Sequence, residues 1–195
     1  MVKEIVYKDY TNKSVEVCRE LCNELMAYQA KQAVIGKEFF EAMTFENRLN
    51  AAFNQATIKS LLVAFNEDTP VGYIFLTADT INEEAKNYRP DWIRRFSADG
   101  NGLFPDWLKT PAKVATLNNL YVSPEYRGHH IGKRLTEHGM NWLENSNADY
   151  FFVYVSNGNN VAPFYEKLGF KFSHPVFGGL IDAYYIKRSP VESHE

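Results

Sequence analysis

A strand-like run that leads through a glycine-containing loop into an amphipathic helix constrains this chain more than any other feature. Residues 114–122 are mostly apolar, the loop reads Tyr-Arg-Gly-His-His over 126–130, and apolar side chains then recur at helical spacing from Ile131. The backbone N–H groups of such a loop and the positive end of the helix dipole converge on one point. Arg127 and Lys133 add positive charge there. We therefore predict a phosphate or pyrophosphate site at the start of this helix.

Hydrophobic periodicity and turn residues indicate a mixed α/β fold. Strands are expected at Lys3–Tyr7, Ser60–Phe65, Val71–Thr80, Val114–Val122, Tyr150–Val155, Phe170–Phe172 and Ile181–Ile186. Helices are expected after a Ser14 N-cap, over Lys37–Asn54, from Ile131 to Leu143 and over Val161–Leu168, where Gly169 ends the last one. We predict one domain over residues 1–188, with a central mixed sheet of about six to seven strands and helices on both faces. The tail, 189–195, is expected to be disordered.

The connection over residues 81–111 differs from the rest of the chain. It combines prolines and an Asp-Gly-Asn-Gly run with the aromatic residues Tyr88, Trp92, Phe96, Phe104 and Trp107. A long connection inside a compact domain is usually functional or disordered, and the aromatic content argues against disorder. We predict a packed insertion with one short helix around Pro90–Phe96.

Charge and cysteine content restrict the partners and the compartment. The 195 residues carry 21 basic against 24 acidic side chains, a net charge of −3 that gives no general attraction to nucleic acid or to an anionic membrane. No apolar run reaches the roughly 20 residues of a membrane span, and the N-terminus lacks the apolar core of a signal peptide. Cys18 and Cys22 fall on one face of an expected helix, where we predict them to be buried hydrophobic residues of a cytoplasmic protein.

Two motifs in this order are similar to the signatures of the GCN5-related N-acetyltransferases (GNAT). The first is Leu-Tyr-Val-Ser-Pro-Glu-Tyr-Arg-Gly-His-His-Ile-Gly-Lys over 120–133, and the second is Asn-Gly-Asn-Asn-Val-Ala-Pro-Phe-Tyr-Glu-Lys-Leu-Gly-Phe over 157–170. The expected hairpin around Pro70–Ile74 also resembles that family, so the likeness covers most of the chain from Ser60 onward. The resemblance implies the GNAT acyl-CoA N-acyltransferase fold and an enzyme that uses acetyl-CoA.

The resemblance also implies which residues hold acetyl-CoA. Main-chain groups of Leu120, Tyr121 and Val122 would contact the pantetheine arm, in a cleft where their strand separates from the strand at 150–155. The pyrophosphate would lie in the loop formed by Arg127, Gly128, His129, His130, Ile131, Gly132 and Lys133. Asn159 and Asn160 are both candidates for binding the amide groups of the cofactor, and the spacing from Tyr165 does not choose between them.

His130 departs from the family pattern, which has a glycine at this place in the loop. The backbone N–H is still present, so pyrophosphate binding is retained as long as His130 does not need a positive φ. No metal site is expected from His129 and His130, because adjacent residues project in different directions and no third ligand is evident.

The resemblance assigns catalysis to Tyr165, whose counterpart donates a proton to the departing CoA thiolate. A phenol with a pKa of about 10 is protonated at neutral pH, which suits that role. Many similar enzymes have a glutamate base on the strand before the loop, whereas this chain has Asn118. An amide cannot accept the proton of the amine, so we expect Asn118 to orient the acceptor or a water molecule. Candidates for a water relay are Tyr154, Ser156, His174 and Asp182.

The acceptor is expected between the first helices, the insertion and the last strands, in a pocket with an aromatic lining and mixed charge. The charged candidates are Glu83, Glu84, Asp91, Arg94, Arg95 and Asp106. We predict acetyl transfer to a primary amine of a small molecule by direct attack in a ternary complex. The alternatives are a protein or peptide amino group as acceptor, or a non-catalytic acyl-CoA-binding module. The sequence leaves open whether the chain forms a homodimer.

Overall fold

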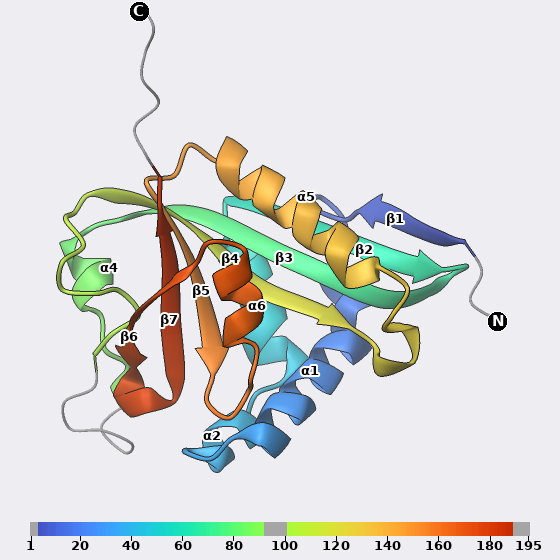
Figure 1. The fold of residues 1–195 in the computed structure, drawn as a ribbon, viewed down its shortest axis with the longest axis horizontal. Coiled ribbons are helices and arrows are strands. Elements are labelled where there is room, and N and C mark those ends of the chain that lie inside the picture. The colour runs from blue at the N-terminus through green and yellow to red at the C-terminus, as the bar shows by residue number, and fades with distance from the viewer. Residues whose placement is uncertain (1–3, 92–100, 189–195) are drawn as a thin grey trace, which may run out of the picture.

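A mixed sheet of seven strands organises the molecule (Figure 1). The computed structural model describes residues 4–91 and 101–188. The strands are β1 (Ile5–Asp9), β2 (Ile58–Asn66), β3 (Thr69–Ile81), β4 (Ala112–Val122), β5 (Tyr150–Ser156), β6 (Lys171–Val176) and β7 (Ile181–Lys187). Their order in the sheet is β1-β2-β3-β4-β5-β7-β6. All neighbours are antiparallel except β4 and β5, which are parallel and confirm the predicted central βαβ unit.

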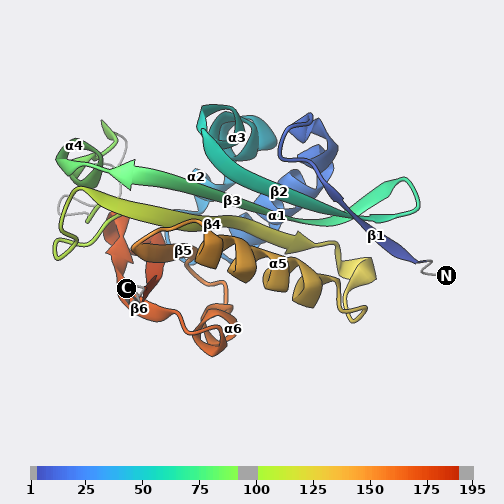
Figure 2. The same cartoon turned by 90° about the horizontal axis from the view of Figure 1, so that it is seen from above.

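Helices cover both faces of this sheet, as predicted (Figure 2). They are α1 (Arg19–Gln32), α2 (Lys37–Glu41), α3 (Ala51–Gln55), α4 (Glu83–Asn87), α5 (Ile131–Asn145) and α6 (Ala162–Lys167). One face carries α1, and its core includes the fully buried Cys18 and Cys22, both of them free thiols. The other face carries α5, whose Leu135 and Leu143 are also fully buried. Within the described ranges, no helix is long and apolar enough to cross a membrane.

The prediction of one helix over Lys37–Asn54 is wrong, because the structure breaks this segment into three pieces. After α2 the chain turns and continues as a π-helical segment, η2 (Glu46–Asn50), which leads into α3. Side chains stabilise the break: Thr44 donates its N–H to Oδ1 of Asn47 at 2.8 Å, and Phe45 donates its N–H to Oδ1 of Asn23 on α1 at 2.8 Å. Because Asn23 is distant in sequence, helical periodicity alone did not reveal this break.

The connection between β3 and β4 packs its second half against the sheet. Phe104 meets Phe152 edge to face at 5.8 Å between ring centroids, and Trp107 lies 4.8 Å from Tyr185. Leu108 is fully buried. The short helix predicted around Pro90–Phe96 lies largely outside the described residues, as does the predicted tail.

The strands β4 and β5 separate halfway along their length. Their parallel pairing runs from Val114 to Leu117 of β4, although β4 continues to Val122. The separation begins at a β-bulge, because on β3 the partner of Phe75 is Asn119 while that of Leu76 is Leu117. Asn118 is therefore the extra residue, and such an insertion bends the strand that contains it. This is the strand separation that the family resemblance implied.

Asn157 ties the end of β5 to the connection between α1 and α2. Its Oδ1 accepts hydrogen bonds from the N–H groups of Val34 at 2.7 Å and Ile35 at 2.8 Å. Its Nδ2 donates to the carbonyl oxygens of Ile35 and Leu180, both at 2.9 Å. One side chain thus holds three backbone segments together beside the separated strands.

Replacing Asn157 should therefore destabilise the protein. Asn157→Ala removes four hydrogen bonds and leaves backbone groups unpaired, so we expect the free energy of unfolding to fall by about 2–4 kcal/mol in a denaturant titration. Asn160→Ala is the matched control, because Asn160 is exposed, and its effect should stay within about 0.5 kcal/mol. Equal effects of the two substitutions would contradict this role of Asn157.

Candidate active site

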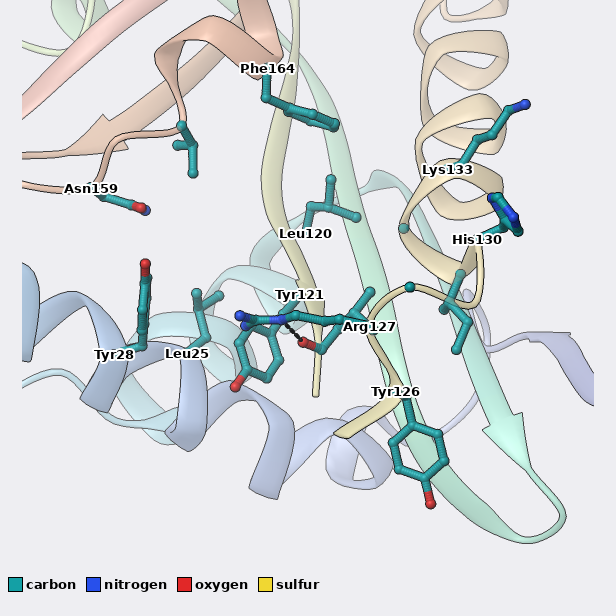
Figure 3. A pocket seen from close by; sticks show the side chains of 15 residues that line it. Leu25, Tyr28, Leu120, Tyr121, Tyr126, Arg127, His130, Lys133, Asn159 and Phe164 are labelled. Carbon is teal, nitrogen blue, oxygen red and sulfur yellow. Dashed lines mark hydrogen bonds between the residues drawn. The ribbon is translucent and has the colours of Figure 1, made fainter. Parts of the chain in front are cut away.

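Two cavities lie along β4. The larger of these two opens where β4 leaves β5 and has a volume of about 580 Å³. Its walls come from α1, the end of β4, the loop before α5, the first turn of α5 and the segment before α6 (Figure 3). The lining residues are Leu25, Tyr28, Leu120, Tyr121, Val122, Tyr126, Arg127, Gly128, His130, Ile131, Gly132, Lys133, Asn159, Val161 and Phe164. This volume is that of a site for a ligand of cofactor size.

The loop before α5 brings backbone donors and positive charge to one end of this cavity. His130 is the N-cap of α5 and has φ 59° and ψ 11°, so the condition that it need not adopt a positive φ is not met. Histidine is among the residues that tolerate this region, which explains how it replaces a glycine here. The side chain of His130 makes no capping hydrogen bond at the start of this 15-residue helix. The N–H groups of its first turn are therefore available to an anion.

Arg127 connects this loop to the end of β4. Its Nε donates a hydrogen bond to the carbonyl oxygen of Val122 at 3.1 Å, and its guanidinium lies 5.8 Å from the centroid of the Tyr121 ring (Figure 3). Burial, together with the nearby negative charge of Glu24, raises the pKa of Tyr121 to about 12. Tyr121 is thus a neutral wall of the cavity at physiological pH, and Arg127 supplies charge there.

The three asparagines of the 157–160 segment have different surroundings. Asn159 lines the cavity, and its Oδ1 is buried without a hydrogen-bond partner among the described residues. Asn160 is exposed and does not line the cavity. The side chain of Asn157 hydrogen-bonds to the backbone segments described above. A buried, unpaired carbonyl oxygen is costly, so the Asn159 side chain fits a ligand that offers an N–H group, as the amides of pantetheine do.

The remaining residues predicted to bind the cofactor line the larger cavity, except for His129. Leu120, Val122, Gly128, Ile131, Gly132 and Lys133 line the larger cavity, whereas His129 is exposed and does not. Sequence reasoning missed five lining residues: Leu25 and Tyr28 of α1, Tyr126, Val161, and Phe164 of α6. Leu25 and Tyr28 are three residues apart and therefore lie on one face of the helix, and this spacing is the sequence signal that could have identified them.

A smaller cavity of about 260 Å³ lies next to the bulge of β4. Its lining comes from the elements where we expected the acceptor: α1, the segment after it, the connection over 81–111, and the strands β5 and β7. The lining residues are Met26, Gln29, Phe39, Phe40, Met43, Arg48, Leu103, Phe104, Thr116, Asn118, Tyr154, Ser156 and Ile181. The predicted aromatic lining is present. Both cavities share α1 and β4, so they are neighbours on the same two elements.

The charge of the smaller cavity differs from the prediction. None of Glu83, Glu84, Asp91 and Asp106 lines it, and Arg94 and Arg95 lie outside the described residues. Arg48, which was not predicted, is the charged lining residue in the described part of the chain. Asn118 donates from Nδ2 to Oγ1 of Thr77 at 2.8 Å and to the carbonyl oxygen of Thr116 at 3.2 Å. This fixes the amide at the bulge.

Tyr165 and the relay candidates occupy different surroundings. Tyr165 belongs to the core beside α5 and is 9% exposed, and it lines neither cavity, although the adjacent Phe164 lines the larger one. Burial raises the pKa of Tyr165 to about 12, so its hydroxyl keeps its proton at neutral pH. Of the relay candidates, Tyr154 and Ser156 line the smaller cavity. His174 does not: its Nε2 lies 2.9 Å from the carbonyl oxygen of Gly102.

The site geometry defines a class of protein: one with a cavity of cofactor size at a helix start suited to an anion, beside a second, smaller cavity. A family model gives the more specific assignment, because it matches residues 20–170 and is described as the Acetyltransferase (GNAT) family. The chain belongs to this family of acetyl-CoA-dependent N-acetyltransferases.

Solved structures agree with this fold at low sequence identity. The PaiA N-acetyltransferase of Thermoplasma acidophilum, in complex with coenzyme A, matches with a TM-score of 0.60 at 20% identity over 95% of this chain and 100% of that one. A putative acetyltransferase of Pyrococcus furiosus has a TM-score of 0.58 at 18% identity, over 96% of this chain and 100% of that one. The Escherichia coli ribosomal-protein-S18-alanine N-acetyltransferase has a TM-score of 0.53 at 16% identity, over 98% and 99% of the chains. A comparison with curated proteins found no significant match.

The left-handed conformation of His130 leads to a test of the loop. His130→Val should lower the free energy of unfolding by about 1–2 kcal/mol, because a β-branched residue is strained at positive φ. His130→Gly should stay within about 1 kcal/mol of the wild type. His129→Val is the control, since His129 is exposed and has no positive φ. Both variants are measured by thermal and denaturant unfolding. If His129→Val destabilised the protein as much as His130→Val, a left-handed backbone confined to His130 would be refuted.

Proposed function

We propose that this enzyme transfers the acetyl group of acetyl-CoA to a primary amine of a small molecule in a ternary complex. The observation that carries the proposal is the pair of cavities on β4, one for a ligand of cofactor size and one of about 260 Å³ beside the bulge. Direct transfer needs both substrates bound at once in neighbouring positions. Cys18 and Cys22 line neither cavity, so neither thiol supports a covalent acyl-enzyme route.

The donor would be held by the residues that line the larger cavity. The start of α5, with Arg127 and Lys133, suits the pyrophosphate. The edge of Leu120–Val122 that has no partner on β5 suits the amides of the pantetheine arm. Oδ1 of Asn159 is a further acceptor for such an amide. When bound, acetyl-CoA supplies an activated acetyl group, and the protein supplies orientation and proton transfer.

The size of the smaller cavity supports a small acceptor over a protein amino group. The E. coli structural neighbour acetylates an alanine of a ribosomal protein, by its name, so a protein acceptor is the second candidate. A screen of small amines and of peptide N-termini, with detection of released CoA, distinguishes the two. Binding of acetyl-CoA without release in either panel would favour a non-catalytic acyl-CoA-binding module. Two buried free thiols suit a reducing compartment, and we propose the cytoplasm.

We assign the general acid to Tyr165, and a phenylalanine substitution tests this. Tyr165→Phe should leave the Kd of acetyl-CoA unchanged and lower kcat by roughly 100-fold or more, because the thiolate then leaves without a proton donor. Tyr184→Phe is the control for removing a hydroxyl from a mostly buried tyrosine of the same core, and Tyr28→Phe tests a rival hydroxyl that lines the larger cavity. Loss of turnover in Tyr28→Phe instead of Tyr165→Phe would transfer the role to Tyr28.

The pH dependence follows from the lining of the smaller cavity. Its described lining contains no carboxylate or histidine that could serve as base, so we expect the enzyme to act on the unprotonated form of the amine. The kcat/KM should rise with pH up to the pKa of the acceptor amine and then remain level, because Tyr165 keeps its proton until about pH 12. Two acceptors with different amine pKa values should have midpoints that differ by the same amount. A common midpoint near neutral pH would instead reveal a base on the enzyme.

A further inference from the structure

Arg48 is a cation without an anion in a cavity that is otherwise aromatic, apolar or neutral. It lines the smaller cavity together with Phe39, Phe40 and Phe104. Its Nη2 donates to the carbonyl oxygen of Asn118 at 3.2 Å. Within the described ranges, no aspartate or glutamate forms an ion pair with it. Burial lowers the pKa of Arg48, which expresses the cost of holding this charge away from water.

The hydrogen bond to Asn118 uses only one of the N–H donors of the Arg48 guanidinium. An arginine has five N–H donors in a planar fork, a geometry that matches a carboxylate. A cation that only supported the β-bulge could use its remaining donors on carbonyl oxygens or on a carboxylate. Here the structure records one such bond, and the ionisable groups beside the guanidinium are Tyr73 and Cys22, both neutral because burial raises their pKa values. Among the described residues no carboxylate occupies the remaining donors.

Ser156 is a second, independent observation in the same cavity. It is 3% exposed, and its Oγ has no hydrogen-bond partner among the described residues. A buried hydroxyl without a partner costs free energy unless a ligand satisfies it. Arg48 and Ser156 come from different elements, η2 and β5, yet both line this cavity. Both can donate a hydrogen bond to an anionic group.

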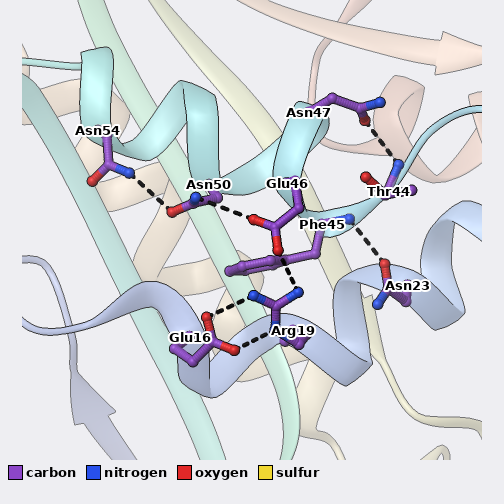
Figure 4. A network of polar contacts seen from close by, with 9 residues as sticks. All are labelled: Glu16, Arg19, Asn23, Thr44, Phe45, Glu46, Asn47, Asn50 and Asn54. Carbon is purple, nitrogen blue, oxygen red and sulfur yellow. Dashed lines mark hydrogen bonds and ion pairs between the residues drawn. The ribbon is translucent and has the colours of Figure 1, made fainter.

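The placement of Arg48 is built into the fold. It lies on the π-helical segment η2, and such segments often occur at functional sites. Figure 4 shows how polar contacts fix this segment against α1. Arg19 pairs with Glu46 of η2 at 2.6 Å and with Glu16, and its guanidinium lies 4.3 Å from the centroid of the Phe45 ring. These contacts join η2 to α1 independently of Arg48, which bonds to β4.

We propose that the acceptor carries a carboxylate, which Arg48 and Ser156 bind while aromatic side chains of the cavity hold its apolar body. This rests on the proposed function and narrows the acceptor to amines of the α-amino-acid type with an apolar side chain. The volume of about 260 Å³ suits one such molecule. The N-terminal residue of a peptide does not meet this requirement, because its carboxyl group is part of an amide bond.

The test compares ligands that differ only in the anion. Calorimetry on the CoA-bound protein would use phenylalanine, leucine and methionine, each beside its amino-acid amide and its decarboxylated amine. We expect at least one acid to bind the wild type roughly tenfold to a hundredfold more tightly than its amide and its amine. Arg48→Met should abolish that preference and leave the Kd of CoA unchanged, and Arg48→Lys should retain part of it. Ser156→Ala should weaken binding of the acid roughly threefold to tenfold.

Arg19→Met is the matched control, because it also replaces an arginine and loosens η2 but leaves the cavity charge in place. It should retain the preference for the acid. Three outcomes overturn the proposal: no acid in the panel binds, acids and amides bind equally, or the preference survives in Arg48→Met. The proposed acetyl transfer is judged separately, by release of CoA with small amines. An enzyme that acetylates simple amines but has no preference for acids would refute this inference and leave the proposed function standing.

Discussion

The position of both cavities depends on one structural constraint, the β-bulge at Asn118. One extra residue in β4 shifts its register with β3, and the pairing with β5 ends at Leu117. Beyond that point one edge of β4 has no strand beside it, and side chains bond two of its carbonyl oxygens: Arg48 that of Asn118 and Arg127 that of Val122. A ligand with amide groups could pair with the main-chain groups between them. The amide of Asn118 is itself held by Thr77 and Thr116, which keeps the bulge in one conformation. A feature of strand pairing thus opens the space that both cavities occupy along β4.

The helix α1 couples the two halves of the site. It contributes Leu25 and Tyr28 to the larger cavity, and Met26 and Gln29 to the smaller one. The helix cannot move relative to β4 without changing both cavities. Its position is fixed from two directions: Asn157 ties the chain just after it to the start of β7, and Asn23 and Arg19 tie it to the segment around η2 (Figure 4). The positions of both cavities therefore depend on the same helix.

The sequence predicted what depends on neighbours along the chain. The loop before α5, the hairpin of β2 and β3 and the glycine that ends α6 were recognisable because a few adjacent residues determine them. The bulge was not visible, since register is a property of two strands. The break before η2 was missed because Asn23, far away in sequence, caps it. The same limit applied to Asn157 and Asn159: their letters are identical, and only their partners in space separate an anchor from a residue that lines the cavity.

The proposed role of Arg48 bears on how the acceptor amine loses its proton. In a free amino acid the carboxylate stabilises the neighbouring ammonium and raises the pKa of the amine, whereas an α-amino group without that charge has a pKa of about 7.7–8.0. Pairing the carboxylate with a buried guanidinium cancels most of this stabilisation. Burial in an apolar cavity lowers the amine pKa further, because it disfavours the charged form. A cation that binds the acceptor would thus also prepare its amine for attack, which reduces the need for a carboxylate base where the chain has Asn118.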